Sequence, residues 1–254
     1  MRPIAFVVAY DGTDWHGFQR QSNGQSVQGE LERALEEVLK HPAPIVAAGR
    51  TDAGVHATGQ VCRFHTTNAI PVDKVPLALN RVLDASVRVR SAREAEEDWH
   101  PRFSARSRVY RYRIENAAIG NPLLRRMTGI VREPVNSAAM DKAAQTLIGS
   151  RDFAAWQSAG SPLGPTVREV KKIAVRQRIV FNCKIVEVEI EANAFLYQMV
   201  RNIVGALIEV GRGNLTESDF ETLTQGLDRT KCPPPAMPQG LCLTKVRYSA
   251  SPSD

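Results

Sequence analysis

The chain has 254 residues, of which 43% are hydrophobic and 24% are charged, a composition typical of globular proteins and not of disordered ones. Its net charge of +6 favours a polyanionic partner but does not identify one. No apolar run approaches the roughly 18–20 residues that cross a bilayer, and the first residues form a strand-like run without a signal peptide. We therefore expect no membrane partner. Since the four cysteines form no C-x-x-C pair, we also expect a cytoplasmic protein with reduced thiols.

The first hundred residues are expected to contain six elements in the order β-α-β-β-α-β, which is the order of a ferredoxin-like unit. Apolar runs and alternating patterns predict the strands, and a 3.6-residue apolar period predicts the helices. Ser26 is expected to cap the first helix, which runs to Lys40. The other predicted elements are Pro3–Tyr10, Pro44–Ala48, Gln60–His65, Val72–Leu83 and Val87–Ala95.

Residues 101–254 repeat this order with longer elements and one added helix, Thr216–Gln225, although residue identity hardly repeats between the halves. The most apolar helix is expected to end at Gly211-Arg212-Gly213, and two long strands are expected to form a hairpin. The predicted elements are Arg108–Ile114, Ser137–Leu147, Val167–Arg178, Ile179–Glu191, Ala194–Val210, Thr216–Gln225 and Leu241–Tyr248. We therefore expect two α+β domains, 1–100 and 101–254.

These patterns predict an α+β protein in which two ferredoxin-like (RRM-like) halves form one extended antiparallel sheet with helices on one face. The other face would be open and wide enough for a folded RNA, because sheets with one covered face are physically normal. The alternative is that a dimer partner or further loops cover that face.

Arginines concentrate in the middle of the chain. Between Trp99 and Val135 there are eight of them, opposed only by Glu115 and Glu133. Guanidinium groups pair with phosphates, and neighbouring aromatic rings such as Tyr110 stack on unpaired bases. A charge run is usually only a solvated surface, but the interleaving with tyrosines favours RNA. The eight arginines are Arg102, Arg106, Arg108, Arg111, Arg113, Arg125, Arg126 and Arg132.

The segment 49–57 reads Gly-Arg-Thr-Asp-Ala-Gly-Val-His-Ala and joins two predicted strands. Its two glycines allow the backbone to turn sharply and to approach a ligand closely. The carboxylate of Asp52 could act as a nucleophile, and the neighbouring Arg50 would favour its ionised form. An ordinary turn is the alternative, because aspartate and glycine are common in turns.

Four segments in order resemble the tRNA pseudouridine synthase A family. One is the loop 49–57. The second comprises Tyr-Asp-Gly-Thr at 10–13 with Trp-His-Gly-Phe-Gln-Arg-Gln at 15–21. The third is Phe-Ser-Ala-Arg at 103–106, followed by Arg-Val-Tyr-Arg-Tyr at 108–112. The fourth is Phe-Leu-Tyr-Gln-Met-Val-Arg-Asn-Ile-Val-Gly at 195–205.

The resemblance implies a homodimeric enzyme that needs no cofactor or metal and isomerises uridine to pseudouridine at positions 38, 39 and 40 of the tRNA anticodon stem-loop. It implies that Asp52 is the catalytic residue and that Tyr110, Arg50 and Arg201 bind the substrate. The sequence contains no nucleotide-binding motif and no histidines at metal-ligand spacing.

Physical arguments suggest roles for these residues. Arg201 lies within an otherwise apolar helical pattern, so it would need a carboxylate partner, for which Asp52 is the candidate. Tyr110 could stack on the flipped base and help to remove its C5 proton, and Arg50 could brace the vacated space. His16 and His56 are expected to be loop scaffolding. The competing functions are a catalytically silent RNA-binding protein and a hydrolase with an aspartate nucleophile.

Overall fold

The computed structural model describes residues 1–21, 24–160 and 164–249. The chain divides into two compact units. Unit 1 comprises Met1–Arg106 and Cys242–Asp254, and unit 2 comprises Ser107–Leu241. Within each unit the strands pair mostly antiparallel. The described residues form two α-helices in unit 1 and three in unit 2, so the predicted α+β class is confirmed.

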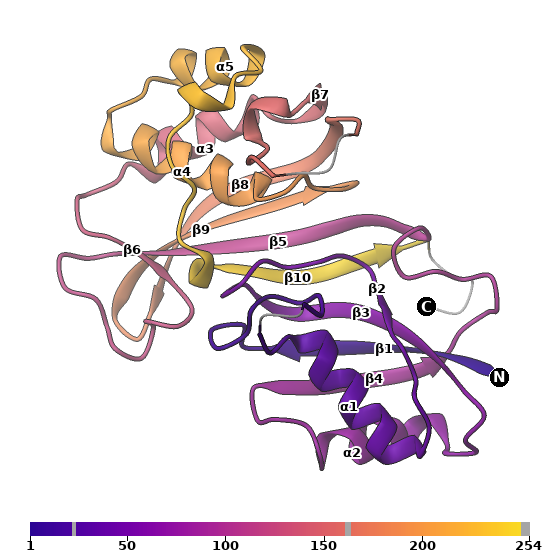
Figure 1. Cartoon of the computed structure of the whole chain (residues 1–254). Coiled ribbons are helices and arrows are strands. Elements are labelled where there is room, and N and C mark those ends of the chain that lie inside the picture. Colours follow the sequence, from indigo (N-terminus) through magenta and orange to yellow (C-terminus); the bar gives the residue numbers. More distant parts are fainter. Residues whose placement is uncertain (22–23, 161–163, 250–254) are drawn as a thin grey trace. The chain divides into compact units, whose positions relative to one another are not determined.

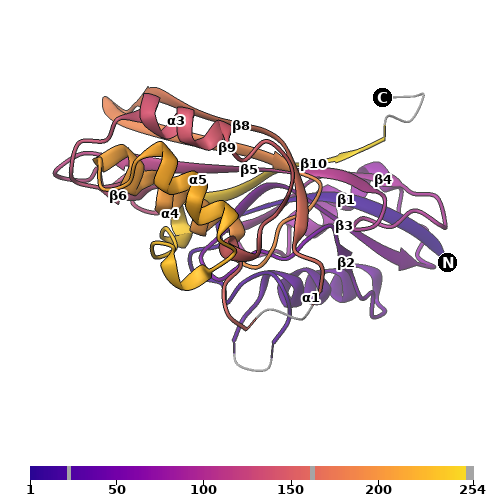
Figure 2. The ribbon, with the colours of Figure 1, turned by 90° about the horizontal axis from the view of Figure 1, so that it is seen from above.

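Unit 1 contains the predicted β-α-β-β-α-β order. Its sheet has the strand order β4-β1-β3-β10. The short β2 pairs with β3 at Cys62 and Arg63, farther along β3 than the residues that pair with β10. Figures 1 and 2 show α1 against one face of this sheet. The elements are β1 (Arg2–Tyr10), α1 (Val27–Leu39), β2 (Val46–Ala47), β3 (His56–Thr66), η1 (Val72–Lys74), α2 (Val75–Asn80), β4 (Val87–Glu94) and β10 (Leu241–Tyr248).

The C-terminal strand β10 pairs in parallel with β3, through Cys242 opposite His56 and Leu243 opposite Ala57. The chain therefore returns to unit 1 after completing unit 2. The expected division into 1–100 and 101–254 had placed this last strand in the second domain. Gly59 permits this pairing, because a Cβ atom built on it would lie only 2.3 Å from the carbonyl oxygen of Thr244.

Unit 2 has the strand order β5-β9-β8-β7, and the short β6 pairs in parallel with β5. The helix α3 packs against β8 and against both α4 and α5 (Figure 1). The elements are β5 (Ala105–Asn116), β6 (Gly129–Val131), α3 (Ser137–Gln145), β7 (Gly149–Asp152), η2 (Ala154–Trp156), β8 (Val167–Val180), β9 (Cys183–Ala192), α4 (Met199–Arg212), α5 (Glu217–Gln225), η3 (Arg229–Lys231) and η4 (Pro238–Gly240).

Local signals placed several boundaries correctly. The Ser26 side chain accepts a hydrogen bond from the Gly29 amide at 3.2 Å, so the predicted cap of α1 is confirmed. Thr216 caps α5 in a reciprocal capping box with Asp219. The hairpin of β8 and β9 is also confirmed, but it turns at Phe181 and Asn182, which both have positive φ as a tight two-residue turn requires. The short strands β6 and β7 were not predicted.

Candidate functional site

Asp52 lies on the loop between β2 and β3 of unit 1, and the backbone at both ends of this loop is fixed. The Ala48 amide donates to the Val61 carbonyl at 2.8 Å, and the Gln60 side chain donates to the Gly49 carbonyl at 2.8 Å. Between these anchors the Val55 amide donates to the Asp52 carbonyl at 3.1 Å, closing a turn. The loop is therefore a defined turn that fixes the backbone of Asp52.

The N-terminal segment packs directly on this turn. The Phe18 amide donates to the Thr51 carbonyl at 3.0 Å, and the hydroxyl groups of Tyr10 and Thr51 are 2.8 Å apart. Gly12 lies directly against the backbone of Val55, because a Cβ atom built on this glycine would be 2.0 Å from the Val55 carbonyl oxygen. Gly17 has a φ of +88°, and a Cβ atom built on it would lie 3.0 Å from the Thr51 carbonyl oxygen. These supporting residues belong to the segment 10–21 that resembles the family, but the sequence did not indicate that they contact the aspartate loop.

Two histidines that were expected to be loop scaffolding lie against backbone segments of unit 1. The Nδ1 atom of His56 accepts a hydrogen bond from the Gly12 amide at 3.0 Å and lies 3.2 Å from a carboxylate oxygen of Asp11. His16 packs against Gly24, where an added Cβ atom would lie 2.5 Å from the imidazole ring. The ring of His56 thus connects the start of the N-terminal segment to β3, which suits a scaffolding role.

Asp52 and its neighbour Arg50 differ in exposure. The Asp52 side chain is half-buried and the Arg50 side chain is exposed. A half-buried carboxylate on a fixed turn is partly shielded from water and can still be reached by a substrate. An exposed guanidinium two residues away can reorient when RNA arrives, which suits a bracing function.

In unit 2, Tyr110 lies on β5 opposite Ile190 of β9. Only 8% of the residue is exposed, and its ring meets the ring of Phe195 edge to face, with centroids 5.1 Å apart. Phe195 precedes α4 and lies in the segment 195–205 that resembles the family. The tyrosine ring is thus held from one side, and its position is set by packing before any base arrives.

Arg201 lies in the first turn of α4 and is half-buried. The apolar pattern around it is buried as predicted, but the helix begins at Met199 and not at Ala194. The cause is local: Gln198 has a φ of +56°, and the Tyr197 carbonyl accepts a hydrogen bond from Ser158 and not from a helical neighbour. The Nε atom of Arg201 donates to the Ala236 carbonyl at 2.8 Å. Its pairing with Asp52 stays a prediction.

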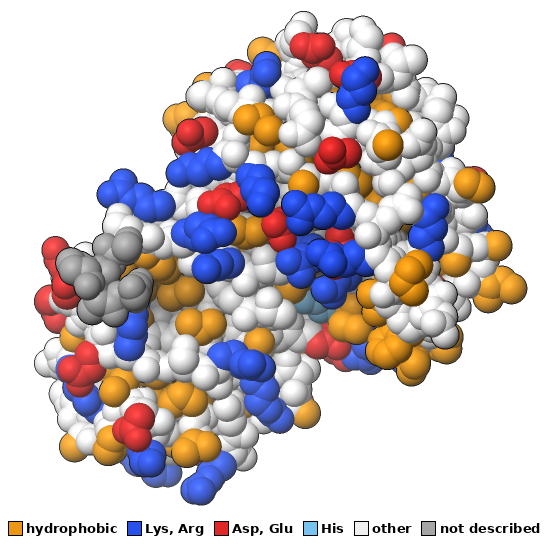
Figure 3. All heavy atoms as spheres, turned by 180° about the vertical axis from the view of Figure 1, so that it is seen from behind, with side chains coloured by type: hydrophobic (Ala, Val, Ile, Leu, Met, Phe, Trp, Pro, Cys, Tyr) orange, Lys and Arg blue, Asp and Glu red, His pale blue; other side chains and the backbone are white. Residues whose placement is uncertain are grey.

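Several of the predicted RNA-binding arginines have carboxylate partners within unit 2. Arg111 pairs with Glu189 at 2.8 Å, and the carboxylate of Glu187 lies 2.9 Å from Arg113 and 2.7 Å from Arg178. Burial alone would raise the pKa of Glu187, but hydrogen bonds from the two arginines and the charge of Arg111 hold it below its ordinary value. Figure 3 shows acidic side chains among the basic ones. This ladder of ion pairs neutralises part of the charge expected to face RNA.

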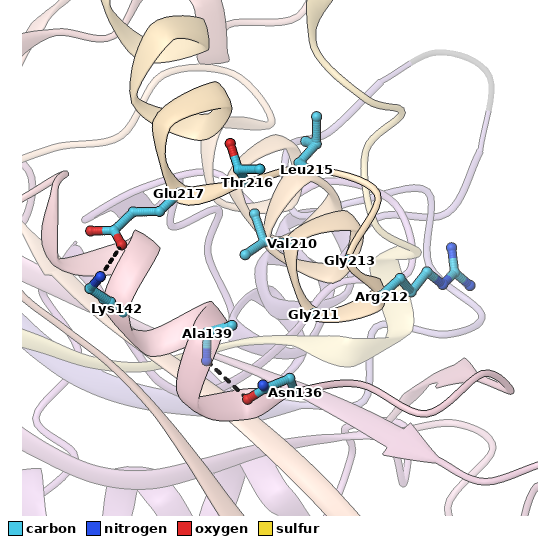
Figure 4. Close-up of a pocket in the computed structure, with 10 residues that line it drawn as sticks. All are labelled: Asn136, Ala139, Lys142, Val210, Gly211, Arg212, Gly213, Leu215, Thr216 and Glu217. Carbon is cyan, nitrogen blue, oxygen red and sulfur yellow. Dashed lines mark hydrogen bonds and ion pairs between the residues drawn. The ribbon is translucent and has the colours of Figure 1, made fainter.

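A hollow of about 480 Å³ in unit 2 is not part of the predicted site. It lies where the first turn of α3 meets the end of α4 and the start of α5 (Figure 4). Lys142 and Glu217 form an ion pair of 2.6 Å across it, and Asn136 caps α3. None of the four predicted site residues lines this hollow.

Within residues 1–21, 24–160 and 164–249, no three His, Cys, Asp or Glu side chains are arranged to hold a metal ion. The same ranges contain no helix that is both long enough and apolar enough to cross a membrane.

The sequence model of the tRNA pseudouridine synthase family matches residues 6–104 and 143–249. The protein named tRNA pseudouridine synthase A of Thermoanaerobacter sp. (strain X514) is 41% identical over 248 residues, covering 98% of this chain and 100% of the relative. The protein of the same name from Geobacter sulfurreducens is also 41% identical, with the same coverage. That from Chloroflexus aurantiacus is 42% identical over 98% of this chain and 89% of its own length.

The class defined by these observations is an RNA-modifying isomerase, a pseudouridine synthase. The chain belongs to the tRNA pseudouridine synthase family. The matched ranges contain Arg50, Asp52 and Arg201, whereas Tyr110 lies in the intervening segment 105–142. The alignments with the relatives cover nearly the whole chain.

Proposed function

We propose that this protein isomerises uridine to pseudouridine at positions 38, 39 and 40 of the tRNA anticodon stem-loop, with Asp52 as the nucleophile. The observation that carries the proposal is the setting of Asp52, a half-buried carboxylate on a turn fixed by Tyr10, Gly12, Gly17 and Phe18. Membership of the family gives the reaction class, and the fixed backbone of the turn supports the assignment of Asp52 as the nucleophile.

The reaction breaks the bond between N1 and C1′ and forms a bond between C5 and C1′, and the C5 proton is lost in exchange for one at N1. Asp52 can attack C1′ and displace the uracil, or it can add to C6 of the ring. In either route the Asp52 carboxylate is regenerated at the end of the reaction, and the product is an isomer of the substrate. The enzyme therefore needs neither an oxidant nor a group donor. We accordingly expect no cofactor and no metal.

Substrate binding is assigned to three residues. The Tyr110 ring would stack on the target base, and its hydroxyl group would help to remove the C5 proton. Arg201 would also bind the substrate. Because a stem nucleotide must leave its stack at a cost of a few kcal/mol, exposed Arg50 would brace the vacated space.

The direct test is to incubate the protein, dialysed against EDTA, with unmodified tRNA and to map pseudouridine along the product. We expect modification confined to positions 38, 39 and 40, with magnesium needed only for the fold of the tRNA. Modification elsewhere would overturn the assigned positions, and a strict need for zinc or a nucleotide would overturn the cofactor-free mechanism. Binding without any product would favour the alternative, a catalytically silent RNA-binding protein.

The ion-pair ladder changes which arginines are expected to contact RNA. We predict that replacing Arg125, Arg126 and Arg132 with glutamine weakens tRNA binding and flattens its salt dependence. These three side chains are exposed on the segment between β5 and α3. For every phosphate that is no longer neutralised, the slope of log K against log salt should fall by roughly 0.7 to 0.9. Filter binding or fluorescence anisotropy at several salt concentrations measures this slope.

The matched control is the double replacement of Arg111 and Glu189 with glutamine, which removes one ion pair of the ladder and leaves the net charge unchanged. Its salt slope should equal that of the unaltered protein. A slope unchanged by the triple replacement would remove the segment from the RNA footprint.

We also propose that the protein is a cytoplasmic homodimer that holds tRNA with both copies. Family membership suggests the dimeric state. A physical argument supports it, because an anticodon arm bound in one active site leaves the rest of the tRNA to be held by the second copy. Sedimentation equilibrium at assay concentrations should give a mass of about twice that of the chain. A fully active monomer at those concentrations would contradict the proposal.

A further inference from the structure

A proline-rich strap, residues 232–240, crosses α4 in unit 2 before the chain enters β10. It contains four prolines, three of them consecutive at 233–235. Proline fixes φ and removes the backbone N–H, so this segment is stiff and has few donors with which to anchor itself. Ala236 is the first residue after the three prolines that can donate a backbone hydrogen bond. The contacts of Ala236 therefore decide where the strap lies.

Both backbone groups of Ala236 are bonded to Arg201. The Ala236 amide donates to the Arg201 carbonyl at 2.9 Å, and Nε of Arg201 donates to the Ala236 carbonyl at 2.8 Å. Because a guanidinium group is planar, fixing Nε fixes the plane and direction of the whole group. The direction in which the two Nη groups of Arg201 point thus depends on the position of the strap.

Gly205 determines how closely the strap approaches α4. It lies one helical turn after Arg201, and a Cβ atom built on it would be 2.1 Å from the Pro234 carbonyl oxygen and 3.3 Å from the Ala236 amide nitrogen. A separation of 2.1 Å is not tolerated by real atoms, and this oxygen belongs to the backbone of a stiff segment. Any side chain at position 205 must therefore displace the strap.

Tyr112 is the second anchor of the strap. Its buried hydroxyl group donates to the Met237 carbonyl at 2.8 Å, and its ring leaves no room for a Cβ atom at Gly240. Burial raises the pKa of the Tyr112 phenol, and the charge of Arg201 opposes that rise. The strap is thus held at two successive residues, Ala236 and Met237.

We propose that Gly205 is a positioning residue, which seats the strap so that Ala236 aims the guanidinium of Arg201 at the substrate. The inference rests on the proposed substrate-binding role of Arg201 and adds the device that orients it. Gly205 itself touches no substrate in this scheme, and its effect passes entirely through the strap to Arg201.

The test begins with Gly205→Ala. We expect the single-turnover rate at saturating enzyme to fall by about 100-fold, because a displacement of about 1 Å in a reacting group can cost that much. The Kd for tRNA should change by less than about fivefold, since most phosphate contacts lie elsewhere. Gly211→Ala is the matched control on the same helix. Its added Cβ atom would meet the side chain of Met140, at 2.8 Å, and the Cβ atom of Val135, at 3.0 Å, and neither residue belongs to the strap, so the rate should be nearly unchanged.

A double-mutant cycle separates positioning from general damage. In the Arg201→Ala background, adding Gly205→Ala should reduce the rate no further, because the residue through which it acts is already absent. An equal loss in both backgrounds would overturn the inference and leave the role of Arg201 intact. If Arg201→Ala alone keeps the full rate, the proposed role of Arg201 fails and the inference fails with it.

Gly205→Ala could also prevent folding, which thermal unfolding would reveal. In that case Pro234→Gly takes its place in the same cycle. It loosens the strap without adding an atom next to α4, and it should reproduce the rate loss only when Arg201 is present. A full rate in Pro234→Gly would contradict the proposal.

Discussion

Replacing Asp52 with asparagine is expected to abolish pseudouridine formation while leaving the fold and the tRNA affinity nearly unchanged. Asparagine has the same size and a similar preference for turns, and two of the hydrogen bonds that fix this turn are accepted by the backbone carbonyls of Thr51 and Asp52, which the substitution keeps. It lacks the negative charge and is a poor nucleophile. Losing a nucleophile costs on the order of 10⁴- to 10⁶-fold in rate, whereas losing a positioning interaction costs roughly 10- to 1000-fold.

Single-turnover formation of pseudouridine on an anticodon-arm substrate measures this effect, and tRNA binding is followed separately. Asp98→Asn is the matched control, because it makes the same chemical change at an exposed loop position of unit 1. It should retain the full rate. If Asp52→Asn keeps a rate within about tenfold of the unaltered protein, Asp52 is only a turn residue and the proposed mechanism is wrong.

The second large effect is expected from Tyr110→Phe. This change keeps the ring and its edge-to-face contact with Phe195, so the fold and the stacking surface should persist. Only the hydroxyl group is removed. If that group helps to remove the C5 proton, the rate should fall by about 100- to 10,000-fold, which is the usual contribution of general base catalysis.

Uridine deuterated at C5 identifies the affected step. In Tyr110→Phe, loss of the C5 proton should become rate-limiting, so a primary isotope effect should appear or increase. Tyr248→Phe is the control, since it removes a phenol hydroxyl group that donates to the Pro101 carbonyl at 2.9 Å and has no part in the proposed mechanism. An unchanged rate without an isotope effect in Tyr110→Phe would limit Tyr110 to stacking.

The sequence by itself determined the local features. Periodic apolar positions predicted α1 and the buried face of α4, and the caps at Ser26 and Thr216 were readable because a cap and its helix are neighbours in the chain. The motif around Asp52 was visible for the same reason. For Tyr110 and Arg201 the local patterns gave only a hint, and the resemblance to the family supplied the substrate-binding roles proposed for them.

The start of α4 and the hairpin turn of β8 and β9 were misplaced by a few residues. At both places non-glycine residues have positive φ, namely Gln198, Phe181 and Asn182. Of these three, only asparagine adopts that conformation readily, so composition gave little warning. Contacts made elsewhere in the fold, such as that between Ser158 and Tyr197, override the helical pattern before Met199.

Only the tertiary structure decided which groups meet across long stretches of chain. The acidic partners of Arg111 and Arg113 lie on β9, more than seventy residues away along the chain. Their carboxylates neutralise part of the positive charge that the sequence shows around these arginines. The close approach of Gly12 to Val55 and of Gly205 to Pro234 is likewise set by packing. A sequence shows that a glycine is present, but the atom that would collide with a side chain there is known only once the chain has folded.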